Sequence, residues 1–494
     1  MSERQGSDDI AAIARGGRTN LFGFFLRLAA RIPFLFIAGR APGYGPAALG
    51  VFASALVLIE LTAMICTLGE KRGLALRLSE SDACPANVVA DGSLVALIAS
   101  GAVALGFWLF PAPLFPGGDY TEIDRLMVLA IPPLALTEIW LAACAYRFDV
   151  GASVRARAIV EPWTISIVAG VMALVAPRSG LSVAYLASVY ASAIAAFVPF
   201  ARAYGWPRGW RPSLSDMGKL TLRSLPIATA DAIEWGTRRL DIFVLGLFAA
   251  PSAVGVYYVA QQVASLPQKL KTSFEPILGP VITRNLKTRD YAAIALQVRQ
   301  VGFWILAAQL GIGLALAIPG EGVMGLVGPQ FVAGTGALAF LLAAEVVAAT
   351  AVVSEAALIY VARMRNLYVS VATVVVQGVL TVAGIVLMQR LGFNQLYQAA
   401  AAAAGLCLAL AFASFAKSHL LARIVQDRIN NWRGALVWAV VPAVFVGWAA
   451  TRFLPEWAEL AFGIPGILAV YFGLLWRYAF GPEDRLLFRK VPTN

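Results

Sequence analysis

Runs of about 20 predominantly apolar residues recur along the whole chain, from near the N-terminus to near the C-terminus. Each run predicts one membrane-spanning α-helix, because a helix of that length crosses a bilayer core of about 30 Å. The 494 residues are 60% hydrophobic and only 14% charged, which excludes a water-soluble fold. We therefore predict an all-α, polytopic membrane protein with about fourteen transmembrane helices. The expected spans are residues 19–39, 46–68, 87–110, 126–146, 159–176, 181–201, 224–249, 252–282, 300–318, 334–361, 366–389, 396–416, 435–451 and 459–476.

The positively charged residues predict the orientation of these spans. Most of the 39 Lys and Arg residues fall into the loops on one side of the membrane, and this side is the cytoplasmic one by the positive-inside rule. Both termini are then cytoplasmic. The net charge of +11 is spread over these loops and not gathered into one stripe, so we expect no nucleic acid partner. The four cysteines and His419 show no metal-ligand spacing, and a GxxxxGK[ST] loop is absent, so we expect no metal, no cofactor and no enzymatic activity.

An internal repeat predicts how the helices are organised. Pro46–Phe52 (PAALGVF) returns as Pro251–Tyr257 (PSAVGVY), and the segment before each copy also matches, as Phe36–Gly39 and Phe243–Gly246. Six expected spans separate the copies, so the halves are parallel repeats related by an axis along the membrane normal. The alternative is that two outer hairpins use Pro and Gly independently for turn geometry. The repeat predicts two six-helix lobes related by a pseudo-twofold axis, followed by two further helices: residues 1–203, 204–420 and 421–494.

Arginines at membrane depth are the candidate substrate-binding residues. Arg31 and Arg238 lie at equivalent positions of the two repeats, and each has an arginine nearby, Arg27 and Arg239. Charged groups at this depth are costly unless they face a polar cavity or a partner, and the planar guanidinium suits phosphate oxygens. Four converging arginines predict a cavity for an anionic, phosphorylated substrate. The alternative is that they extend to the membrane interface or pair with helix ends. Two lysines in the next span complete the candidate set or mark the inner end of a broken helix: Lys269 and Lys271.

Acidic residues in the spans form a second candidate group. Asp231, Glu234, Arg238 and Asp241 follow spacings that place them on one stripe of a helix. These acids hold the arginines in place and couple transport to H⁺ or Na⁺, or they form an internal charge ladder that only neutralises the helix. Single acids in otherwise apolar spans are further candidates for protonation or for helix packing: Glu60, Glu138, Glu345 and Glu355.

Several segments resemble the membrane exporters that flip lipid-linked oligosaccharide units for O-antigen, capsule or exopolysaccharide, within the multidrug, oligosaccharidyl-lipid and polysaccharide exporter superfamily. The resemblance covers roughly residues 20–420, and the segments that carry it are Arg238–Gly246, Gly255–Tyr258, Ser273–Pro280, Tyr44–Phe52 and Gly69–Arg72.

This resemblance implies two six-helix lobes that open alternately to the two sides of a bacterial inner membrane. Its cationic cavity holds the diphosphate and sugars of an undecaprenyl-diphosphate-linked oligosaccharide, while the tail stays in the membrane lipids. A polysaccharide polymerase and other assembly proteins are the implied partners. A multidrug exporter of the same fold is the main alternative, although four arginines disfavour cationic drugs. A membrane-embedded glycosyltransferase or ligase needs a larger outer loop than this chain provides.

Overall fold

The computed structural model describes residues 32–80, 84–268, 282, 285–286, 288–482 and 484–487, and all regular elements of this part are helical. Eleven helical segments of the described part are long and apolar enough to cross a membrane. The prediction of an all-α, polytopic membrane protein is confirmed. The number of fourteen spans stays a prediction, because the expected span 19–39 lies largely outside the described residues. The expected seventh and eighth spans correspond to two helices that are not among the eleven.

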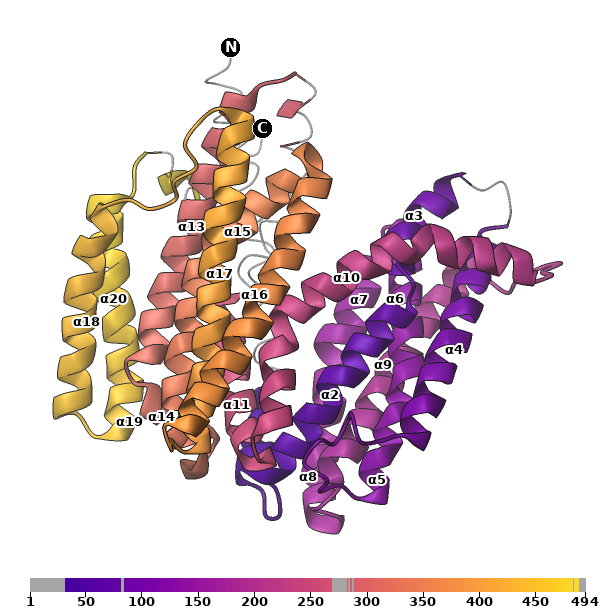
Figure 1. The fold of residues 1–494 in the computed structure, drawn as a ribbon, viewed down its shortest axis with the longest axis horizontal. Coiled ribbons are helices and arrows are strands. Elements are labelled where there is room, and N and C mark those ends of the chain that lie inside the picture. Colours follow the sequence, from indigo (N-terminus) through magenta and orange to yellow (C-terminus); the bar gives the residue numbers. More distant parts are fainter. Residues whose placement is uncertain are drawn as a thin grey trace. The chain divides into compact units, whose positions relative to one another are not determined.

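Contacts between Cα atoms divide the chain into two compact units, with the boundary between Tyr258 and Val259. The first unit contains mainly long helices joined by short loops (Figure 1). Its elements are α2 (Pro46–Cys66), α3 (Glu70–Glu80), α4 (Pro85–Leu109), α5 (Glu122–Arg125), η1 (Leu126–Ala130), α6 (Ile131–Tyr146), α7 (Val150–Ser153), η2 (Val154–Val160), α8 (Glu161–Val175), α9 (Gly180–Tyr204), α10 (Leu214–Phe248) and the first part of α11 (Pro251–Gln268). The lobes predicted from the repeat, 1–203 and 204–420, place the division before α10. The division into these lobes stays a proposal.

The two copies of the repeat pack directly against each other in this first unit. A Cβ on Gly50 of the first copy would lie 1.7 Å from the carbonyl oxygen of Pro251, which opens the second copy. A Cβ on Gly255 of the second copy would lie 1.9 Å from the carbonyl oxygen of Pro46, which opens the first. Each glycine therefore meets the first residue of the other copy, and α2 and α11 approach to backbone contact. A twofold axis between the copies would produce this reciprocity.

Several helical segments extend beyond the expected spans, and the fifth is one of them. The sequence placed the fifth span at residues 159–176, with Arg155 and Arg157 in the preceding loop, whereas the candidate membrane span begins at Gly151. The added segment includes η2, a π-helical turn that runs from Val154 to Val160 and continues directly into α8. Arg157 is accommodated within the span because it forms two ion pairs, described below.

The second unit has a hydrophobic core around α13, built from aliphatic and aromatic residues of α13 and neighbouring helices. Gly405 of α17 lies so close to α16 that a Cβ would be 2.9 Å from the backbone nitrogen of Thr381. The helices of this unit after the remainder of α11 are α13 (Tyr291–Ala317), α14 (Gly320–Val327), η4 (Pro329–Gly334), α15 (Thr335–Val361), α16 (Arg363–Arg390), α17 (Gln395–Val425), α18 (Ala435–Phe453), α19 (Glu456–Ala458), η5 (Glu459–Gly463), α20 (Ile464–Leu474), η6 (Leu475–Ala479) and η7 (Asp484–Leu487).

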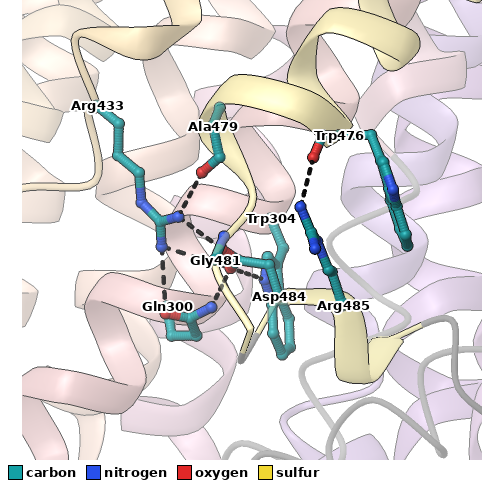
Figure 2. A network of polar contacts seen from close by, with 8 residues as sticks. All are labelled: Gln300, Trp304, Arg433, Trp476, Ala479, Gly481, Asp484 and Arg485. Atoms are coloured by element: carbon teal, nitrogen blue, oxygen red, sulfur yellow. Dashed lines mark hydrogen bonds and ion pairs between the residues drawn. The ribbon is translucent and has the colours of Figure 1, made fainter.

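A polar network ties the C-terminal segment to α13 (Figure 2). The side chain of Asp484 is almost fully buried, and its carboxylate pairs with Arg433 Nη1 at 2.6 Å. Trp304 Nε1 of α13 donates to the same carboxylate at 2.8 Å, and the backbone nitrogen of Gly481 donates at 2.7 Å. The guanidinium of Arg433 also lies 3.7 Å from the centroid of the Phe303 ring. The network therefore fixes the end of η6 and the start of α18 on α13, within the second unit.

Candidate functional site

The charged stripe of α10 reaches the repeat contact at its C-terminal end. Asp241 is fully buried, and the Tyr257 hydroxyl donates a hydrogen bond to its Oδ2 atom. Tyr257 is itself fully buried and is the last residue of the second repeat copy. Arg239 lies close enough to interact electrostatically with Asp241. The buried carboxylate thus holds α10 and α11 together, and the tyrosine is a partner that the helical spacing did not predict.

Arg238 and Arg239 are half-buried neighbours on α10, and both have interaction partners. They lie less than one turn before Asp241, so the helix presents two cationic side chains beside one buried acid. Asp231 and Glu234 lie on the same helix, but their side chains are outside the described part. The other cations of the predicted site lie outside the described residues; they are Arg27, Arg31, Lys269 and Lys271. The convergence of these side chains on one site stays a prediction.

A second charged group lies in the first unit around Arg157. Its guanidinium is bracketed by two carboxylates, with Nη2 bonded to Glu138 of α6 and Nη1 at 2.6 Å from Glu161 of α8. About a quarter of each of the three side chains is exposed. One arginine between two glutamates leaves a formal charge of −1 when all three are ionised. Glu138 was predicted from the sequence as a single acid; the structure instead makes it one arm of an ion triad.

Tyr185 of α9 joins this triad to the repeat. Its hydroxyl is buried without a hydrogen-bond partner in the described part, and it lies within electrostatic range of Glu60, Glu161 and Arg157. The Tyr185 ring also packs edge-on against Phe52 of the first repeat copy, with the ring centroids 5.7 Å apart. The structure therefore brings Glu60 and Glu138, predicted separately, into the electrostatic surroundings of one polar cluster formed by α2, α6, η2, α8 and α9.

Sequence reasoning did not identify Arg157, Glu161 or Tyr185 as members of this cluster. The spacing of four between Arg157 and Glu161 was an available signal, because such a pair lies on one face of a helix. Tyr185 gave no such signal, because an isolated tyrosine in an apolar run commonly packs against neighbouring apolar side chains.

The other acids predicted from the sequence lie in the second unit. Glu355 of α15 pairs with Lys417 of α17 at 3.0 Å, and the lysine side chain is almost fully buried. Glu345 also has an interaction partner. The part of the chain that the structure describes contains no group of three His, Cys, Asp or Glu residues that could hold a metal ion.

Residues 44–301 match the model of a family described as polysaccharide biosynthesis protein, which is more than half of the chain. The chain belongs to this family. Among curated proteins, no significant match is found.

The fold of this chain is similar to the solved structures of several membrane transporters. The lipid II flippase MurJ in an inward closed conformation has a TM-score of 0.68 at 11% identity, over 94% of this chain and 98% of that one. An inward-facing multidrug resistance MATE family transporter has a TM-score of 0.63 at 13% identity, over 82% of this chain and 99% of that one. A MOP superfamily transporter from Pyrococcus furiosus has a TM-score of 0.55 at 13% identity, over 85% and 95%. The transporter fold that the sequence resemblance implied is confirmed, and so is the resemblance to a polysaccharide biosynthesis family.

Proposed function

We propose that this chain is a flippase for undecaprenyl-diphosphate-linked oligosaccharide units. It moves them by alternating access across the bacterial inner membrane, with both termini cytoplasmic, for O-antigen, capsule or exopolysaccharide biosynthesis. The observation that carries the proposal is the Arg238–Arg239 pair on α10, in a chain of the polysaccharide biosynthesis family. Guanidinium groups are suited to the oxygens of a diphosphate, and α10 carries two half-buried ones at consecutive positions. The flippase MurJ supports the proposal by its fold and by its lipid-linked substrate, lipid II.

In this proposal, Arg27 and Arg31 contribute from the first repeat, and Lys269 and Lys271 extend the cationic path. Asp241 keeps α10 in place through its bond to Tyr257, so its contribution to binding is indirect. The single acids Glu60 and Glu138 belong to a cluster that is suited to proton coupling, since two carboxylates pair with Arg157 and Glu60 acts on the neighbouring Tyr185. A polysaccharide polymerase and other assembly proteins would receive the product.

The test is export in cells that lack the native gene. Arg238→Ala and Arg31→Ala should reach the membrane in near-normal amount and fail to export polymer, while lipid-linked units accumulate on the cytoplasmic leaflet. Arg238→Lys should retain partial activity, because it keeps the charge and loses the bidentate geometry. Arg452→Ala, at the exposed end of α18, is the matched control and should export normally. Fully active alanine variants at normal expression would refute the cationic site.

Multidrug efflux is the second candidate, and the Glu138–Arg157–Glu161 triad is the observation that favours it. A net negative charge inside the first unit suits cationic compounds and proton exchange. If efflux is the function, Glu161→Gln should abolish extrusion of a cationic dye, and Arg238→Ala should leave extrusion intact. The flippase proposal expects no dye extrusion by the wild-type chain.

A further inference from the structure

A groove of about 730 Å³ lies on the first unit, between η2 and α9. Its volume falls within the range of about 300–1,000 Å³ that is usual for small-molecule sites. The walls are apolar except for two arginines, Arg155 and Arg202. The apolar lining residues are Val160, Ala191, Ile194, Ala195, Val198 and Pro199.

The lining residues of α9 form a stripe along one face of the helix, from Ala191 to Arg202. At about 1.5 Å per residue this stripe is about 16 Å long, close to half of the bilayer core of about 30 Å. Arg202 lies near the C-terminal end of α9, and Arg155 lies near the start of the antiparallel segment η2–α8. Both arginines therefore lie at one end of the groove, at the same side of the membrane, and the apolar stripe extends one leaflet deep.

The apolar wall of the groove is exposed. Ile194 is 64% exposed and Val198 is 40% exposed, although both belong to a membrane-spanning helix. Arg155 pairs with Asp149 at 3.4 Å, but both side chains are about half exposed and such a pair contributes little. A guanidinium has five N–H donors, so this pair leaves donors for a second acceptor.

We propose that the groove binds one anionic phospholipid of the surrounding bilayer. Its phosphate lies between Arg155 and Arg202, and one acyl chain follows the apolar stripe of α9. Basic pockets between transmembrane helices recognise anionic head groups in this way. The depth of one leaflet favours an acyl chain over a polyprenyl chain, which extends well beyond Ala191. The groove does not include the arginines of the proposed flippase site, so it is independent of that function.

The test is phosphatidylglycerol binding to the purified full chain in detergent, measured by native mass spectrometry during titration. Arg155→Gln with Arg202→Gln should weaken binding about tenfold or more, because both phosphate partners are lost. Val198→Trp should weaken it to a similar degree by filling the groove while both arginines remain. Arg178→Gln, in the loop at the opposite end of the α8–α9 pair, is the matched control and should bind as the wild type does.

Three results would overturn the proposal. Equal binding of phosphatidylcholine and phosphatidylglycerol would remove the role of charge, and unchanged binding by Val198→Trp would remove the groove. Displacement of phosphatidylglycerol by an equal or lower concentration of a polyprenyl phosphate would assign the site to the carrier lipid. If the double arginine variant does not fold, the Val198→Trp variant still decides, because position 198 is partly exposed and tolerates a larger apolar side chain.

Discussion

Replacing the two crossing glycines by alanine perturbs the contact between the repeat copies without adding charge or polarity. In Gly50→Ala the new Cβ would lie 1.7 Å from the carbonyl oxygen of Pro251, and in Gly255→Ala it would lie 1.9 Å from that of Pro46. Cβ atoms essentially never come closer than 3.0 Å to such an atom, so the helices α2 and α11 must separate by at least about 1 Å. Both clashing atoms are backbone carbonyl oxygens, so no flexible side chain can turn away to relieve the clash.

The cost follows from two opposing terms. Overpacking a close helix contact costs about 1–3 kcal/mol, while alanine stabilises a helix over glycine by about 0.5–1 kcal/mol. We expect a net destabilisation of about 1–2 kcal/mol for each single variant. Both clashes occur at one crossing, so the separation forced by the first substitution relieves much of the second. The double variant should therefore lose clearly less stability than the sum of the two single variants.

The assay uses the cysteines of the chain. Cys66 and Cys144 are free and buried, so a thiol-reactive dye reports unfolding when they become accessible, over a baseline from the exposed Cys84. The dye is followed during titration with a denaturing detergent. Gly101→Ala, in α4, is the control, because no heavy atom lies within 4 Å of its new Cβ, and it should be neutral or slightly stabilising. If Gly50→Ala behaves as Gly101→Ala does, or if the two crossing substitutions are fully additive, the reciprocal contact is refuted.

Three further predictions concern polar contacts. Asp484→Ala should lower the stability by about 2 kcal/mol, because it leaves buried donors unpaired, whereas Arg485→Ala should have little effect; thermal unfolding measures both. Arg157→Gln should destabilise the first unit by leaving two carboxylates facing each other, and a second change, Glu138→Gln, should restore part of the loss in the same assay. Burial raises the pKa of Tyr44 to about 12, and its hydroxyl donates to Ala169 O at 2.9 Å. Because the folded state keeps this proton while the unfolded state loses it near pH 10, stability should fall as pH rises from about 10 to 12, and Tyr44→Phe should remove that part of the fall in alkaline unfolding curves.

The membrane spans could be predicted from the sequence because burial in lipid imposes a length and a composition on each helix separately. The fifth span shows where this local rule fails. Arg155 and Arg157 suggest a loop when their neighbours alone are considered, yet Arg157 lies inside the span since Glu138 neutralises it from another helix. The partner lies 19 residues earlier in the chain, and no short-range pattern indicates which side chains meet across helices.

In the candidate site, too, the positions along one helix could be predicted from the sequence, but the contacts between helices could not. The repeat identified Arg238 as a special position, and the spacing on α10 placed Asp241 on the same stripe. The spacing offered Arg238 as a partner of Asp241, and it gave no indication of the hydrogen bond that the acid accepts from Tyr257 of the next helix. The repeat also indicated that Pro46–Phe52 and Pro251–Tyr257 are equivalent. It did not indicate that Gly50 and Gly255 each contact the first proline of the other copy. Such contacts depend on how helices cross, which the sequence of one helix does not contain.

The π-helical turn η2 determines which change in length its segment can accommodate. A π-helical turn holds one residue more than an α-helical turn, so the residues before it are rotated relative to those after it, compared with a continuous α-helix. Removing one residue between Val154 and Val160 would restore regular winding, and the loss of that residue's rotation of about 100° would offset the change in winding, so the residues before Val154 would keep their direction relative to Glu161. Related sequences that carry a one-residue gap here should therefore keep the two ends of this helix in the same relative orientation, with a regular α-helix in place of the π-helical turn.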